Sequence, residues 1–325
     1  MKKILVGTDY SRQARHALLV AMDIARRAHA DIILFHAFNQ PISVGEAYRL
    51  EAAITDLERE KNRILEDYVR EVKWDVTKDF SLSFLSTSEP GTEELEAGNL
   101  TKSGHHALVS SQEAEKVGLK IICVSRFGLP SETLLAAAEA YEVDLLVMGT
   151  RGAGPVSQAF LGSTVADMIQ AGKVPVLALP LQAELRDRST FVFALDMAAI
   201  PDQAMIRWLR DWVKLFQSHL KVLHVYSGKD PEQEQQKAVE ALDMLDTEMI
   251  DLSYEVYFLE REIVSQGVQE FIQLHQAELL MLVPRHHTFL EILLQRTLTG
   301  LLESQGLMPL LTLPYSAERQ EERKK

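Results

Sequence analysis

Gly149-Thr-Arg-Gly-Ala-Gly-Pro-Val-Ser-Gln-Ala-Phe-Leu-Gly-Ser163 is the stretch that decides the fold. It follows the apolar run 145–148, typical of a buried strand, and precedes a helical pattern over 164–171 that Gly172 closes. Glycine has no Cβ, so the amides of such a loop can approach a ligand closely. A helix opening at Ser163 adds free N–H groups that favour phosphate. The stretch therefore predicts a phosphate-binding loop between a strand and a helix, although a tight turn alone would also use these glycines.

Strands and helices alternate on both sides of this loop. Apolar runs predict strands at residues 4–6, 32–35, 119–124, 145–148 and 174–180. Ser11 is a suitable N-cap for a helix that carries Ala14, Leu18 and Ala21 on one face, and Ser131 for a helix that runs to Tyr141. This alternation predicts an α/β fold with a largely parallel sheet.

The pattern repeats in the second half of the chain. Residues 191–196 match 4–9, and residues 279–283 and 308–314 match 145–149 and 174–180 at a constant offset of 134. We therefore predict a tandem duplication. The first repeat spans residues 1–182 and the second 188–316, with a linker near 181–188 and a polar tail at 317–325.

The first repeat carries an insertion near residues 75–118 that the second lacks. The residues before it predict a long helix that places Leu57, Leu65 and Val72 near one face. A loop as long as the rest is usually functional or disordered, and the sequence does not decide between the two.

Composition narrows the class of protein. The 325 residues carry a net charge of −13, which opposes non-specific binding to nucleic acid or an anionic membrane surface. The single cysteine, Cys123, lies in an apolar run and is interpreted as an inert buried thiol. The N-terminal apolar run is too short for a signal peptide, and no run could span a membrane. We expect a cytoplasmic protein.

The spacing Gly149-x2-Gly152-x9-Gly162-Ser163, together with Gly7-Thr-Asp9 at the end of the first strand, resembles the universal stress protein family. The resemblance covers nearly the whole chain as two repeats. It implies an α/β fold of two tandem universal-stress-type domains, Rossmann-like and similar to adenine nucleotide alpha hydrolases. Each domain is expected to be a five-stranded parallel sheet flanked by helices.

The resemblance also implies an ATP site in the first repeat. Carried over residue by residue, phosphates would lie against Gly149, Gly152, Gly162 and Ser163, with a further amide from Thr164. Gly7 and Asp9 would lie at the adenosine, with Asp9 as a contact to the base, the ribose or a metal, and Ala37 and Met148 would line the apolar slot for adenine. Mg²⁺ could accompany ATP at Asp9, which could instead serve only as a helix cap. Ligand binding beyond the carboxyl ends of parallel strands fits this assignment.

The second repeat lacks the loop glycines. The offset places Val283 at Gly149, His286 at Gly152 and Arg296 at Gly162, and only Thr297 keeps the hydroxyl of Ser163. Side chains there should block the same phosphate pose. We therefore predict that the second repeat does not bind ATP in this manner.

The resemblance implies a stress-response or regulatory protein. No base for water stands out, so we expect no enzyme, or at most slow ATP hydrolysis. The alternative is a non-catalytic scaffold or small-ligand sensor acting through the second repeat and the insertion. A third hypothesis is an enzyme of the related adenine nucleotide hydrolase folds. The histidine pairs at 105–106 and 286–287 have no further ligands, which disfavours a metal site. We expect the fifth strands of the repeats to pair within the chain, and a homodimer stays open.

Overall fold

The computed structural model describes residues 1–40, 50–76, 82–86, 119–150, 161–197, 202–226, 231–284 and 308–314. The chain divides into two compact units, Met1–Ala153 and Gly154–Lys325. The linker expected near 181–188 thus lies inside the second unit, and the repeat boundaries stay a prediction. The mixed α/β class is confirmed, with a large parallel sheet and flanking helices. None of the described helices combines the length and apolarity that crossing a membrane would require.

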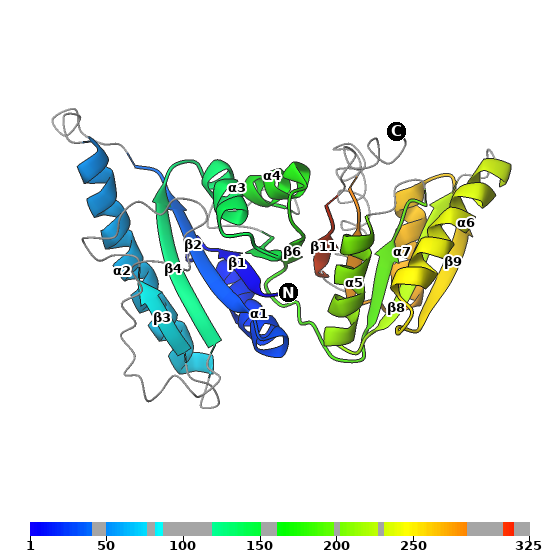
Figure 1. Ribbon diagram of the computed structural model, residues 1–325, viewed down its shortest axis with the longest axis horizontal. Helices are drawn as coiled ribbons and strands as arrows, with labels where there is room; N and C mark the ends of the chain where they lie inside the picture. The colour runs from blue at the N-terminus through cyan, green and yellow to red at the C-terminus, as the bar shows by residue number, and fades with distance from the viewer. Residues whose placement is uncertain are drawn as a thin grey trace. The chain divides into compact units, whose positions relative to one another are not determined.

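The first unit contains a sheet in the order β3-β4-β2-β1-β5, and every neighbouring pair of strands in it is parallel (Figure 1). Parallel strands covered on both faces need continuous apolar runs, which is why the sequence shows them so clearly. The strands are β1 (Lys3–Gly7), β2 (Asp31–Phe38), β3 (Leu82–Ser86), β4 (Leu119–Phe127) and β5 (Leu145–Gly149).

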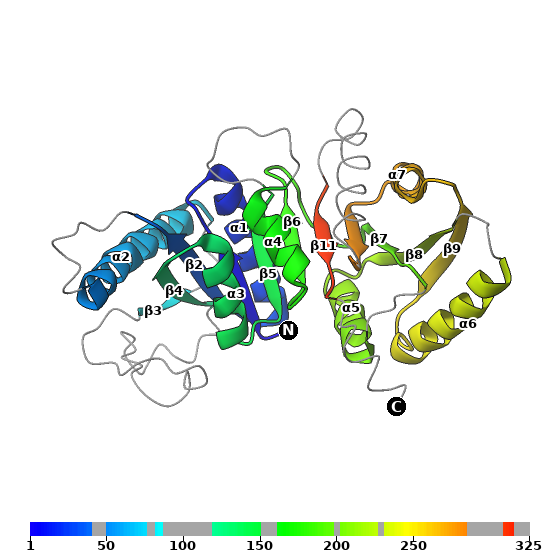
Figure 2. The same ribbon diagram turned by 90° about the horizontal axis from the view of Figure 1, so that it is seen from above.

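Helices α1 and α2 cover one face of this sheet and α3 covers the other (Figure 2). The long helix expected before the insertion is present as α2, and its Leu65, Val69 and Val72 are fully buried, whereas Ile64 is 43% exposed. The helices are α1 (Arg12–Ala28), α2 (Leu50–Val76) and α3 (Pro130–Ala140).

The helix starts follow capping chemistry, with one correction. Ser11 is the N-cap of α1, and its Oγ accepts a hydrogen bond from the Ala14 amide at 3.1 Å. Ser131 is not the N-cap of α3. The helix begins one residue earlier, at Pro130 behind the extended Leu129, because proline already has a helical φ and needs no partner for its missing N–H.

The second unit has the strand order β6-β11-β10-β7-β8-β9. Five of these strands are parallel, and β6 pairs antiparallel with β11, with Leu177 opposite Leu311. These two are the strands identified as the fifth of each repeat. The strands are β6 (Val176–Leu179), β7 (Thr190–Ala194), β8 (His219–Tyr226), β9 (Tyr254–Glu260), β10 (Leu279–Leu282) and β11 (Leu310–Thr312).

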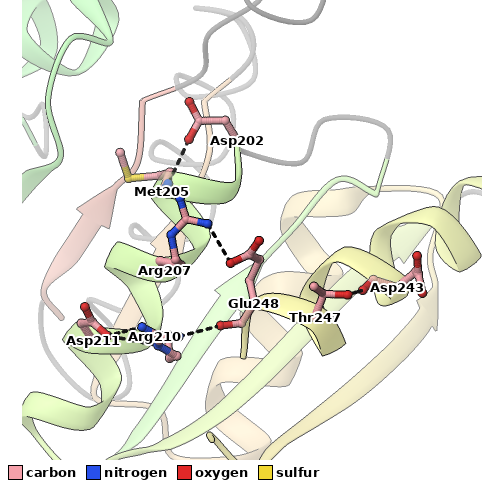
Figure 3. Close-up of polar contacts among 8 residues, drawn as sticks. All are labelled: Asp202, Met205, Arg207, Arg210, Asp211, Asp243, Thr247 and Glu248. Carbon is pink, nitrogen blue, oxygen red and sulfur yellow. Dashed lines mark hydrogen bonds and ion pairs between the residues drawn. The ribbon is translucent and has the colours of Figure 1, made fainter. Parts of the chain in front are cut away.

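The helices of the second unit are α4 (Ser163–Ala171), α5 (Gln203–Leu215), α6 (Pro231–Glu248) and α7 (Val264–Leu274). Arginines on α5 join it to the end of α6 (Figure 3). Arg207 Nη1 lies 2.9 Å from Glu248 Oε2, and Arg210 Nη1 donates to the Glu248 carbonyl at 3.1 Å. On α5, Trp212 is 1% exposed and stacks on the half-buried Trp208, with the ring centres 5.5 Å apart.

The first repeat contains one strand more than expected. Five strands were predicted for residues 1–182, and the described residues of that range contain six, because β3 adds to the edge of β4. This strand lies in the insertion, whose residues 87–118 are outside the described part of the chain. By pairing along β4, β3 supplies hydrogen-bond partners for backbone N–H and C=O groups that would be unpaired if β4 were the edge strand.

Candidate functional site

The carboxyl ends of β1, β2 and β5 lie side by side in the first unit and bring three of the predicted residues onto one face. Gly7 pairs with Phe35, so Ala37 points to the same side as Gly7, and the β1–β5 register places Met148 there too. A Cβ on Gly7 would lie 3.4 Å from Met148 Cε and 3.6 Å from Leu134 Cδ1 of α3. Gly7 and Met148 are buried, whereas Ala37 is half-buried. Gly7 and Met148 therefore form a packed floor, and Ala37 is the more accessible of the three.

Gly149 faces the other side of the sheet, toward α1. A Cβ at this position would lie 2.7 Å from Gln13 Cβ and 2.8 Å from the Gln13 carbonyl carbon. Real Cβ atoms do not approach backbone so closely, because the overlap is strongly repulsive. The close approach of the first turn of α1 thus requires glycine here for packing alone.

Asp9 is exposed directly after β1 and organises the turn into α1. Its Oδ1 accepts a hydrogen bond from the Ser11 amide at 3.0 Å, which is an Asx turn. The capping interpretation of Asp9 therefore has a geometric basis. A carboxylate exposed beside a helix N-terminus remains accessible to a ligand as well.

Thr8 and His36 stabilise the same turn, between β1 and α1, through hydrogen bonds. The Thr8 amide donates to the Phe35 carbonyl at 2.9 Å, and Thr8 Oγ1 accepts from the Tyr10 amide at 3.1 Å. His36 Nδ1 lies 2.9 Å from the Thr8 carbonyl oxygen. Because a carbonyl only accepts, Nδ1 carries the proton and His36 is held in one tautomer. Burial lowers the pKa of His36 below its ordinary value, which keeps the ring neutral at pH 7.

Aromatic side chains surround this turn, and no sequence motif predicts them. Tyr10 has a φ of 62°, a left-handed conformation unusual for an aromatic residue, and its ring lies 4.6 Å from His36. Tyr68 of α2 packs edge-on against Tyr10 at 5.2 Å. Burial raises the pKa of both tyrosine hydroxyls, so both stay protonated near neutral pH. No motif predicts a left-handed tyrosine, because tertiary packing selects it.

The predicted phosphate-contacting residues at the start of α4 lie in the second unit. Gly162 is the N-cap, in an extended conformation, and Ser163 is the first helical residue. The helix therefore opens at Ser163 as predicted, but Ser163 is not itself the N-cap. Ser163 is exposed and Thr164 half-buried. Gly152, His286, Arg296 and Thr297 lie outside the described residues, as do both histidine pairs.

The second repeat keeps the histidine but changes its neighbours. His224 Nδ1 lies 3.0 Å from the Leu195 carbonyl oxygen, the same contact that His36 makes with Thr8. Met197 follows Asp196 where Tyr10 follows Asp9. Val283, at the position of Gly149, is 6% exposed. The recurrence indicates that this histidine is a structural brace between the first two strands of each repeat.

In the described parts of the chain, no three His, Cys, Asp or Glu side chains gather as ligands of one metal ion. Cys123 is buried, and burial raises the pKa of its thiol to about 12. A thiol with that pKa stays protonated and is a poor ligand and nucleophile near neutral pH.

Comparisons with a family model, with known sequences and with solved structures all point to one protein family. The model of the Universal stress protein family matches residues 1–180. Universal stress protein MJ0577 of Methanocaldococcus jannaschii is 26% identical over 179 residues, covering 55% of this chain and 94% of that protein. The crystal structure of a universal stress protein from Archaeoglobus fulgidus covers 97% of both chains at 15% identity, with a TM-score of 0.59. A universal stress protein from the same organism, solved in complex with dAMP, covers 33% of this chain and 90% of that one at 16% identity, with a TM-score of 0.29.

Proposed function

Because the chain belongs to the universal stress protein family, we propose that its first repeat binds an adenine nucleotide, with ATP as the ligand. The role is stress-related or regulatory rather than metabolic. The observation that supports the proposal most is the carboxyl edge of β1, β2 and β5. There an exposed carboxylate, Asp9, adjoins the accessible Ala37 at the ends of adjacent parallel strands. Ligands of open parallel sheets bind beyond this edge.

Different residues are assigned to the base and to the phosphates of the nucleotide. Ala37 offers an apolar surface for the base, over the floor that Gly7 and Met148 form. Backbone amides are the donors that phosphate prefers at the start of a helix, and Ser163 and Thr164 open α4. The proposal assigns the phosphates to these amides and to those of the loop that carries Gly152.

Asp9 has two compatible tasks in this proposal. Its Oδ1 holds the Ser11 amide, which fixes the turn into α1. The negative charge would attract Mg²⁺ accompanying ATP, since oxygen ligands and phosphate together suit that ion. The bound ion would screen the phosphate charge, and the chain would supply one carboxylate to it. No step of hydrolysis is assigned.

The second repeat is not proposed to bind a nucleotide in this way. Val283 carries a buried side chain where Gly149 has none, and Met197 stands in the place of Tyr10. We further propose that the pairing of β6 with β11, seen with Leu310 opposite Ala178, is what joins the two repeats within one chain.

Titration of the full chain with ATP and Mg²⁺ by calorimetry tests the proposal. We expect one site per chain. Asp9→Asn is the informative variant because the amide oxygen can still accept from Ser11, so the turn is kept while the charge is lost. Asp196→Asn is the matched control at the equivalent position of the second repeat. Equal loss of binding in both variants, or no binding by the unaltered chain, would contradict the proposal.

A further inference from the structure

Four buried polar atoms without a hydrogen-bond partner among the residues that the structure describes lie at or beneath α2 in the first unit. Three of them are Tyr10 Oη, Glu66 Oε1 and Ser125 Oγ, which we call the α2 cluster; the fourth is Tyr68 Oη. Ser125 is 0% exposed, and Glu66 has its other oxygen, Oε2, 3.8 Å from the guanidinium of Arg70 near the surface.

The fold brings the three atoms together from different parts of the sequence. Ser125 pairs in register with His36, so the two side chains point to the same face of the sheet. Tyr10 lays its ring on His36 at 4.6 Å, one strand away from Ser125. Helix α2 covers this face, and its Asn62 Oδ1 accepts from the Ser125 amide at 2.5 Å. Glu66 is one helical turn beyond Asn62 and therefore lies on the same side of α2.

Burial raises the pKa of the Cys123 thiol, and the negative charge of Glu66 raises it further. Burial is also the main cause of the raised pKa of Tyr10, and the charge of Cys123 adds to it. Cys123 lies two residues before Ser125 on β4, on the same face. The cluster is thus centred over the second half of β4.

The chemistry of the cluster suits a small polar molecule. Native proteins rarely leave buried polar atoms without partners. A carboxylate oxygen accepts, whereas the two hydroxyls can both donate and accept. A buried water molecule typically makes two to four hydrogen bonds, which is what these three groups offer.

The second repeat provides an internal comparison. Met197 stands at the position of Tyr10, and Phe258 pairs in register with His224 as Ser125 pairs with His36. Neither side chain carries a hydroxyl. Both hydroxyl positions of the cluster are therefore apolar in the second repeat, where Phe258 is 47% exposed whereas Ser125 is fully buried.

We propose that the α2 cluster binds an ordered internal water molecule that bridges Glu66 on α2 to Ser125 on β4 and to Tyr10 in the β1–α1 turn. The water links the long helix to the turn that carries Asp9. Neither Glu66 nor Ser125 is assigned a contact with the nucleotide.

A crystal structure of the full chain at about 1.5 Å or better tests the proposal directly. We expect a water oxygen within about 3.2 Å of Ser125 Oγ and of at least one of Glu66 Oε1 and Tyr10 Oη. A direct Tyr10–Glu66 hydrogen bond that excludes water, or a cluster without density between its atoms, would overturn the proposal.

Thermal unfolding of Ser125→Ala and Tyr10→Phe gives a second test through the sign of the change. If a water satisfies these hydroxyls, each variant loses a hydrogen bond and its Tm falls by about 2–4 °C. If the hydroxyls are dry, removing them relieves buried unpartnered groups and raises the Tm, which would refute the proposal. Ser189→Ala is the control, because that hydroxyl donates to the Arg186 carbonyl at 2.8 Å and its loss must lower the Tm.

Discussion

Substituting Gly149 with alanine should destabilise the protein, whereas the same change at Gly7 should not. A Cβ at position 149 would lie 2.7, 2.8 and 3.0 Å from Cβ, C and O of Gln13, and two of these are backbone atoms that cannot rotate away. Forcing atoms into such a contact typically costs about 1–3 kcal/mol. At position 7 the nearest atoms are side-chain carbons at 3.4–3.6 Å, an ordinary contact distance. Alanine at position 7 also restricts the unfolded chain, which stabilises the folded state by about 0.4–1 kcal/mol and offsets part of any packing cost.

Urea denaturation of the full chain, followed by circular dichroism, measures both variants. We expect Gly149→Ala to lower the free energy of unfolding by about 1–3 kcal/mol with an unchanged m-value, and Gly7→Ala to stay within about 1 kcal/mol of the parent. A Gly149→Ala variant as stable as the parent would refute the packing role of this glycine. Equal destabilisation by both variants would show that neither strand end tolerates alanine, and that the contact of Gly149 with α1 is not the cause.

Three further predictions concern single side chains. Asp9→Asn should leave stability within about 0.5 kcal/mol, measured by urea denaturation, and lower the affinity for Mg–ATP about tenfold, measured by calorimetry. Because the folded pKa of His36 is below its ordinary 6.5, stability should be complete above pH 6.5 and decline as the pH falls through the folded pKa; His36→Gln should flatten that part of a stability–pH profile. Arg210→Met should cost about 1 kcal/mol by removing its bond to the Glu248 carbonyl, and an unchanged unfolding midpoint would contradict this.

Much of the fold could be predicted because its signals are local. Buried parallel strands such as β1 and β5 appear as continuous apolar runs, and Ser11 precedes α1 with the right capping chemistry. The start of α3 was harder, because Pro130 and Ser131 both suit a helix start and proline takes the first helical position. Strand β3 was missed because it lies in a polar insertion and two of its five residues are serines, so it shows no continuous apolar run like those of β1 and β5.

The candidate site was only partly accessible from the sequence. Motif spacing identifies Gly149, but only the three-dimensional contact with Gln13 shows that α1 itself requires the glycine. The same holds for Tyr10, whose left-handed backbone and contact with His36 arise from packing across three elements. Asp9 shows the converse: the sequence offered both a cap and a ligand role, and the structure supports the first without removing the second.

The most direct test of the central claim is native mass spectrometry of the purified full chain, before and after addition of Mg–ATP. We predict one adenine nucleotide per chain, bound about tenfold more weakly by Asp9→Asn and with unchanged affinity by Asp196→Asn. A chain that binds no nucleotide, or that binds two with equal affinity, would contradict the account of one intact and one altered repeat.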